Sequence, residues 1–160
     1  MSSWVRALTP RALAALAALG SATLLLSAGA GPSAAVSVPR GDAVLVVGSH
    51  RYYLQLAITP AQQELGLGER AKLPLHEGML FVYHSSTTRC FWMKGMKFAL
   101  DMIWLSSSDD VVSVQPDVLP KYYPSTYCAE AEDVIELDAG QARVAGIVVG
   151  HIVKLEMPPS

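Results

Sequence analysis

The chain has 160 residues, of which 51% are hydrophobic and 16% are charged, and its formal net charge is −2 at pH 7. This length suits a single domain, and this composition excludes an intrinsically disordered chain. Lys and Arg form no cluster along the sequence, whereas nucleic-acid binding normally requires one, so we expect no nucleic-acid partner.

Residues 1–30 have the layout of an export signal. Arg6 and Arg11 precede an apolar stretch without charges, which matches the positive and apolar regions of a signal peptide. Small residues follow, and they predict cleavage after Ala30 or, as a second site, after Ala35. The sequence therefore predicts an extracytoplasmic protein that is secreted or held in the cell envelope.

The same segment permits two other interpretations. A membrane-spanning helix needs about 20 apolar residues, and residues 12–30 nearly reach that length. An uncleaved anchor would therefore contact the membrane through these residues alone, again with the rest of the chain outside the cytoplasm. A buried N-terminal helix is the third interpretation, but the segment is apolar on every face and lacks an amphipathic stripe.

Residues 31–42 contain Gly, Pro and Ser and predict a flexible linker. A single β-rich domain is expected over residues 43–156. It opens with a strand predicted at 43–47 and another at 51–58, where apolar and polar side chains alternate. The turn-like residues between them favour a hairpin.

A short helix is predicted directly after the second strand. Thr59 is a suitable N-cap, Pro60 suits the first helical position, and Gln62 completes a capping box. Gly66 and Gly68 then end the helix early.

The rest of the chain predicts short strands separated by turns. They span residues 78–83, 90–94, 101–106, 111–115, 134–138 and 152–156, with one helical turn at 141–145. Many short strands with turn signals between them are typical of a sandwich or barrel. The expected fold class is therefore mainly β, with one or two short helices.

The densest group of candidate functional residues lies in segments 90–94 and 100–104. If these segments pair as neighbouring strands, Lys94 and Asp101 lie near the connection and form an ion pair beside Trp92. Such a pair could be the polar floor of an aromatic-walled pocket. It could equally be a structural ion pair that orders the connection.

Arg70 is another candidate, because a guanidinium can bind a carboxylate or phosphate through two hydrogen bonds. The alternative interpretation is that Arg70 is a solvated loop residue without a binding role.

Acidic pairs could be drawn from Asp101, Glu136 and Asp138, but without geometry they do not predict a glycosidase. The four histidines stand at no metal-ligand spacing, and no GxSxG or phosphate-loop motif occurs. We therefore predict no metal and no cofactor, and we recognise no catalytic motif.

The chain has two cysteines, Cys90 and Cys128. An even number in an exported chain suggests a disulfide, and two buried thiols are the alternative. A bridge would close a loop of about 40 residues and stabilise the domain by about 3–4 kcal/mol.

Several short motifs occur in the order and spacing of a known family. They are Thr59-Pro60, Gly66-Leu67, Arg70, Leu73, Gly78-Met79-Leu80-Phe81-Val82, Phe91-Trp92-Met93-Lys94, Leu100-Asp101-Met102, Val134-Ile135-Glu136-Leu137-Asp138-Ala139-Gly140, Gly146 and Gly150. With these motifs the chain, over residues 51–156, resembles the domain-of-unknown-function 192 family, also called uncharacterised protein family 0127. The resemblance implies a compact β-rich fold of sandwich or jelly-roll type, often behind a signal peptide, and it implies no reaction.

The chain departs from the family pattern next to Lys94. The family usually has Asn-Thr where this sequence has Gly95-Met96, so two polar groups are lost there. Trp92, Lys94 and Asp101 are kept, which leaves the aromatic and ionic part of the pattern intact.

Three functional hypotheses follow. The first is an envelope module that binds a small ligand or a partner protein through Arg70, Trp92, Lys94 and Asp101. The second is an envelope hydrolase in which Asp101 acts as acid or base and Lys94 tunes it. The third is a purely structural domain.

Overall fold

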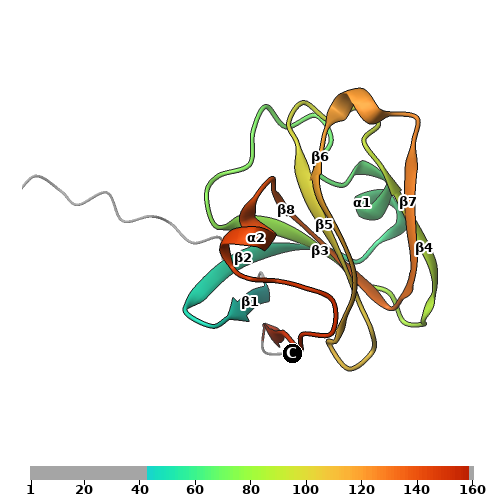
Figure 1. Cartoon of the computed structure of the whole chain (residues 1–160). Coiled ribbons are helices and arrows are strands. Elements are labelled where there is room, and N and C mark those ends of the chain that lie inside the picture. The colour runs from blue at the N-terminus through green and yellow to red at the C-terminus, as the bar shows by residue number, and fades with distance from the viewer. Residues whose placement is uncertain (1–42, 159–160) are drawn as a thin grey trace, which may run out of the picture. The chain divides into compact units, whose positions relative to one another are not determined.

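The computed structural model describes residues 43–158 (Figure 1). The predicted signal or anchor and the predicted linker lie outside the described residues. Within 43–158 no helix is both long enough and apolar enough to span a bilayer. This part of the chain forms a curled sheet of seven strands, a second sheet of two strands and two short α-helices, which confirms the predicted mainly β class.

The strands of the large sheet run in the spatial order β6-β5-β8-β3-β2-β1-β9. Their bounds are β1 (Ala43–Val47), β2 (His50–Ala57), β3 (Glu77–Phe81), β5 (Leu100–Leu105), β6 (Val111–Val118), β8 (Asp133–Asp138) and β9 (Lys154–Glu156). The small sheet pairs β4 (Thr87–Trp92) with β7 (Thr126–Ala131), and the helical elements are α1 (Pro60–Leu65), α2 (Gln141–Val144) and the 3-10 turn η1 (Pro120–Tyr122). In the large sheet, β2 and β3 are parallel and the other neighbours are antiparallel.

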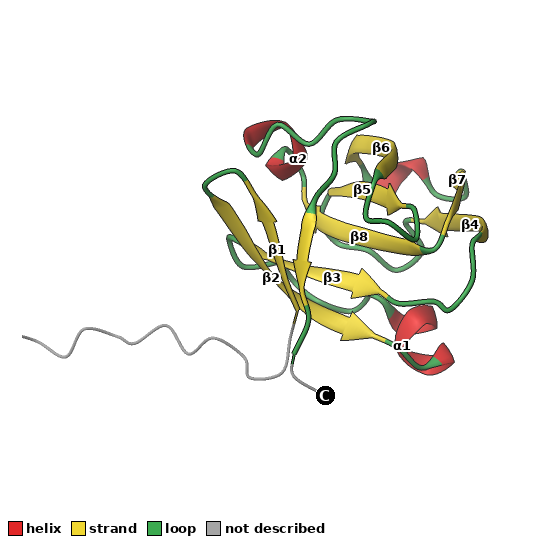
Figure 2. Ribbon diagram, turned by 90° about the horizontal axis from the view of Figure 1, so that it is seen from below, coloured by secondary structure: helices red, strands yellow, loops and turns green. Residues whose placement is uncertain are grey.

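The central strands β3, β5 and β8 of the large sheet are buried on both faces. One face carries core residues that include Leu54, Leu80, Ile103, Ile135 and Leu137, and α2 packs against it through Ala142. The other face carries Met79, Phe81, Met102, Trp104 and Val134 and meets the small sheet. Figure 2 shows α2 and the small sheet on opposite sides of β5 and β8. Double burial explains why β5 is an unbroken buried run rather than an alternating one.

The predicted pairing of segments 90–94 and 100–104 is wrong. β4 pairs with β7, and β5 lies between β6 and β8 in the other sheet. The residues between β4 and β5 lead the chain from one sheet to the other instead of turning it back as a hairpin. β7 was not expected from the sequence, because its residues lack a strong apolar pattern; they alternate between exposed and half-buried up to the buried Ala131.

The predicted capping box of α1 is present. The Thr59 hydroxyl accepts a hydrogen bond from the Gln62 backbone N–H, and the Gln62 side chain accepts one from the Thr59 N–H. Gly66, at φ 51°, then turns the chain close to the Phe81 ring. The cap and this turn fix α1 beside the end of β3.

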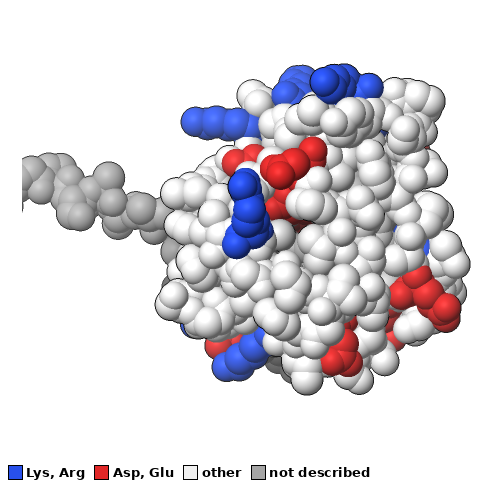
Figure 3. Space-filling view, viewed as in Figure 1, with Lys and Arg blue, Asp and Glu red and all other residues white. Residues whose placement is uncertain are grey.

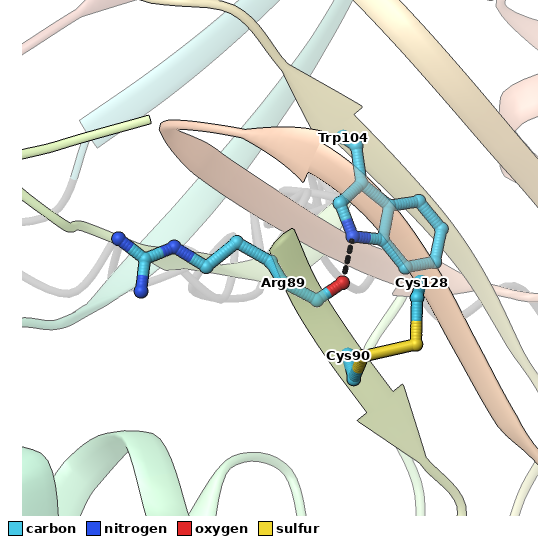
Figure 4. The surroundings of a disulfide bond; sticks show 4 residues. All are labelled: Arg89, Cys90, Trp104 and Cys128. Carbon is cyan, nitrogen blue, oxygen red and sulfur yellow. Dashed lines mark hydrogen bonds between the residues drawn. A yellow bond between two sulfur atoms is a disulfide. The ribbon is translucent and has the colours of Figure 1, made fainter. Parts of the chain in front are cut away.

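Cys90 and Cys128 form a disulfide (Figure 4). The two residues are direct cross-strand partners in β4 and β7, 38 positions apart in sequence. The bridge therefore joins the two strands of the small sheet. It is compatible with an oxidising, extracytoplasmic location.

Trp104 connects the two sheets. Its indole N–H donates a hydrogen bond of 3.0 Å to the Arg89 carbonyl oxygen in β4 (Figure 4). The Phe91 ring meets the Trp104 ring edge to face, with centroids 6.1 Å apart, a favourable aromatic geometry. β4 is thus held against β5 by a polar and an aromatic contact.

We expect Trp104→Phe to lower the free energy of unfolding by about 2 kcal/mol, because it removes this hydrogen bond and leaves space in the core. Urea denaturation of the full-length chain measures the effect. Trp92→Phe is the matched control, since Trp92 is exposed, and it should change stability by less than about 0.5 kcal/mol. Equal effects of the two changes would contradict this assignment.

Candidate functional site

A cavity of about 310 Å³ lies between α1, the turn that follows it, and β4. That volume corresponds to about ten water molecules in the liquid. Its aromatic side chains are Phe81, Tyr83, Phe91 and Trp92, and its charged side chains are Glu64, Lys94 and Glu136. The cavity thus combines apolar walls with a few ionisable groups, which is the usual make-up of a small-molecule site.

Glu136 is the buried acid of this cavity. It lies in β8 opposite Met79 of β3 and Met102 of β5, and only 4% of its surface is exposed. Burial alone raises the pKa of Glu136 to about 8, because the ionised carboxyl loses its hydration. No hydrogen bond or charge from the described residues opposes this rise. The cavity therefore contains a carboxyl group that is mostly protonated at neutral pH.

The wall beside Glu136 is held by aromatic packing. The Phe81 ring of β3 and the Phe91 ring of β4 meet edge to face, with centroids 4.8 Å apart. Phe91 also packs on Trp104, so its ring is fixed from two sides. Trp92, the next residue of β4, is 49% exposed. The cavity thus has a fixed inner wall and an accessible indole at its rim.

Tyr83 already carries a cation on its ring. The Arg89 guanidinium lies 3.8 Å from the ring centroid and also donates a hydrogen bond to the Ser85 carbonyl oxygen. The Arg89 Nε is buried and has no hydrogen-bond partner. Burial raises the pKa of Tyr83, and the nearby Arg89 charge lowers it in part. Arg89 therefore supports the Tyr83 ring and does not itself line the cavity.

Two of the candidate residues from sequence, Trp92 and Lys94, line the cavity. The same two residues also line a neighbouring hollow with Tyr123, Pro124 and Thr126. They therefore stand between two concave regions of the surface. The structure brings this pair together and separates it from the other two candidates.

Asp101 lies on the opposite face of the large sheet and is fully buried. Its carboxylate accepts hydrogen bonds from the backbone N–H groups of Asp117 at 2.8 Å, Gly140 at 3.1 Å and Ala142 at 2.7 Å. β6 has a bulge at this point, and Asp117 there has φ 54°. Asp101 therefore joins β5 to the bulge of β6 and to the start of α2.

The predicted Lys94–Asp101 ion pair is wrong. In residues 43–158 the ion pairs are Arg51–Glu156 and Lys154–Glu156. The pairing failed because it assumed that β4 and β5 are adjacent strands. Lys94 is exposed at the cavity rim, while the Asp101 carboxylate is occupied by backbone donors.

Arg70 holds the loop after α1. Its guanidinium donates a hydrogen bond of 2.5 Å to the Gln55 side chain in β2. Arg70 is half-buried and is not one of the residues that line the cavity. Arg70 therefore ties the loop after α1 to the large sheet.

Sequence reasoning named Glu136 among three acids that could form a pair, but it did not select Glu136 as a site residue. The available signal was a single acid within Val134–Leu137, a segment that is otherwise apolar. A strand buried on both faces should be apolar throughout, so an acid at its centre marks a special position. The described residues contain no group of three His, Cys, Asp or Glu side chains that could hold a metal ion.

Comparisons with known proteins identify a family and relatives of the same fold. The family model described as DUF192, Uncharacterized ACR, COG1430 matches residues 12–155. A crystal structure described as a "putative transcription regulator" from Sinorhizobium meliloti 1021 is 28% identical, with a TM-score of 0.65, over 76% of this chain and 96% of that one. A protein of unknown function from Novosphingobium aromaticivorans DSM 12444 is 28% identical, with a TM-score of 0.63, over 72% of this chain and 83% of that one. No curated protein gave a significant match.

Proposed function

The chain belongs to the DUF192 family, and we propose that it is a binding module whose cavity holds a small organic molecule between Glu136, Trp92 and Lys94. The observation that carries this proposal is the Glu136 carboxyl, which is buried at an aromatic-walled cavity and has no partner among the described residues. A carboxyl that the fold leaves without a hydrogen bond does not favour folding, and its position at the cavity leaves it accessible to a ligand.

The position of Asp101 favours binding over the alternative of an Asp101-dependent hydrolase. Both carboxylate oxygens of Asp101 accept backbone hydrogen bonds, and the residue lies across the sheet from the cavity. A general acid or base must reach its substrate. In this arrangement Asp101 serves the fold, and the cavity supplies the candidate site.

The charged side chains are scattered over the face of the molecule that Figure 3 shows. On the face shown in Figure 3, basic and acidic side chains form small separate groups with uncharged surface between them. The proposed ligand therefore binds at a local cavity and not on a broad charged patch. We also propose that the protein works outside the cytoplasm, which is supported by the export-like sequence of residues 1–30 and by the disulfide.

A fragment screen tests the binding function. We expect ligand-observed NMR on the full-length chain to find small aromatic or amphipathic fragments that bind at the cavity. Trp92→Ala should weaken their binding at least about tenfold, the effect of losing roughly 1.4 kcal/mol of contact. Tyr122→Ala is the matched control, because Tyr122 is also an exposed aromatic residue and does not line the cavity. A screen without binders, or binders equally insensitive to both changes, would overturn the proposal.

A further inference from the structure

We propose that the ligand of this cavity is a small organic ammonium ion, whose positive nitrogen lies against the Glu136 carboxylate and whose carbon atoms contact the aromatic wall. This inference rests on the proposed binding function and names the ligand class. It is built from the missing partner of Glu136, the chemistry of the wall and the few free polar groups of the cavity.

Glu136 has no hydrogen-bond or charge partner among the described residues. With 4% of its surface exposed, the residue is almost fully removed from water, and burial is the one cause of its raised pKa. The complementary group must therefore come from the cavity, where the carboxyl can meet water or a ligand. An uncharged ligand would add a hydrogen bond, whereas a cation would add a charge interaction that is stronger in a poorly hydrated cavity than in water. A cation is thus the ligand that gains most from this carboxyl.

The cavity wall around the Glu136 carboxyl is rich in aromatic rings. Aromatic rings attract cations through their faces, and this attraction is strongest for tryptophan. Trp92 offers an accessible indole at the rim, and Tyr83 shows that a ring of this cavity already holds the Arg89 guanidinium at 3.8 Å. Carbon atoms on the ammonium nitrogen would also bury apolar surface against Phe81 and Phe91. The wall therefore favours an organic ammonium over a hydrated metal ion.

Few polar side chains of the cavity are free to bind a ligand. The Gln63 amide N–H groups are already directed at carbonyl oxygens of Ala57, Ile58 and Val82. The remaining charged groups are the Glu64 and Glu136 carboxyls and the Lys94 ammonium. A sugar would leave hydroxyl groups unpaired in such a cavity. An anion would be repelled by Glu64 and, above the pKa of about 8, by the Glu136 carboxylate as well. A cation with few hydrogen-bonding groups fits this inventory.

The affinity for such a cation should depend on pH through Glu136. The charged groups that face its side of the sheet are Glu64 from α1, Lys94 after β4, and Arg89 and Asp133 beside Tyr83. Burial raises the pKa of Glu136 to about 8, so below that value the carboxyl must lose a proton before it can pair with the ligand. The affinity for a permanently charged cation should therefore rise about tenfold per pH unit up to about pH 8 and then level off.

Choline and its uncharged isostere 3,3-dimethylbutan-1-ol test the ligand class, with binding to the full-length chain measured by calorimetry or NMR from pH 6 to pH 9. The choline affinity should increase about 50-fold between pH 6 and pH 8, because the ionised fraction of a carboxyl with a pKa of about 8 rises from about 1% to about 50%. The isostere should bind with little dependence on pH. Glu136→Gln should lower the choline affinity at pH 8 at least tenfold and abolish its pH dependence, while the isostere is retained.

Glu130→Gln is the matched control, because Glu130 is an exposed carboxylate of β7 that does not line the cavity. It should change the choline affinity by less than about threefold, the size of a screened surface charge effect. If choline binds no better than the isostere, or if Glu136→Gln leaves its affinity unchanged, the ammonium proposal is wrong while small-molecule binding stands. If neither probe binds and the fragment screen also gives no ligand that depends on Trp92, both proposals are wrong.

Discussion

Asp101→Asn is expected to lower the free energy of unfolding by about 3–5 kcal/mol, the range for breaking a buried, charge-assisted network. The carboxylate accepts three backbone hydrogen bonds in a fully buried position. An asparagine amide would keep one acceptor oxygen and turn an N–H₂ group toward a backbone donor. Unfolding of the full-length chain in urea, followed by far-UV circular dichroism, measures the loss.

Lys94→Met provides the contrast to this variant. Lys94 is exposed and forms no ion pair with Asp101, so its replacement should change stability by less than about 0.5 kcal/mol. A large loss in Asp101→Asn alone would support the role of Asp101 in joining β5, β6 and α2. Large and similar losses in both variants would instead show that the two side chains are coupled, against the geometry described above.

Glu136→Gln is expected to stabilise the protein at neutral and alkaline pH. The pKa of Glu136 is raised from 4.5 to about 8 by burial, so between these values the folded chain keeps a proton that the unfolded chain releases. The free energy of unfolding therefore falls as pH rises, by about 1.4 kcal/mol per pH unit from this group. Gln does not titrate, and the variant should exceed the wild type by about 3 kcal/mol at pH 7 and more at pH 8.

The comparison between the two proteins at several pH values isolates Glu136, because the other acids are common to both. The difference in stability should be small near pH 4.5, the ordinary pKa of a glutamate, where the carboxyl is protonated on both sides of the unfolding equilibrium. Glu64→Gln is the control at an exposed site and should show no comparable trend. A constant difference across this pH range would refute the assignment of Glu136 as the buried titrating acid. A variant that is more stable and no longer binds a cation would show that the acid is kept for function at the expense of stability.

Local features of the fold could be predicted from sequence because their causes are local. The capping box at Thr59 and Gln62 depends on residues three positions apart, and the strand that directly precedes it follows a simple alternation. The disulfide was one of two open alternatives, since the sequence gives a pair of cysteines but not the distance between them. The structure resolves that choice because Cys90 and Cys128 are cross-strand neighbours.

The candidate site was only half predictable for a physical reason. Trp92 and Lys94 were selected as part of a dense aromatic and ionic segment, and they do line the cavity. Asp101 was selected from the same segment, but its face was decided by the pairing of β5 with β6 and β8. Between β4 and β5 the chain passes from the small sheet to the large sheet, and this decides which side chains lie near Asp101. The residues next to Asp101 in sequence do not indicate that passage. Glu136 comes to the cavity through strand order alone, from more than 40 residues further along the chain.

The disulfide also has a consequence for proteolysis. The covalent loop between Cys90 and Cys128 contains β5, β6 and η1, so it encloses two strands of the large sheet and an exposed corner at Tyr122–Ser125. A protease that cuts once at this corner leaves both fragments joined through the two sulfur atoms. β4 and β7 stay paired in the nicked molecule, and the wall formed by Phe91 and Trp92 is still anchored. Outside a cell, where proteases are present and thiol reductants are scarce, the bridge lets the cavity outlast a broken chain.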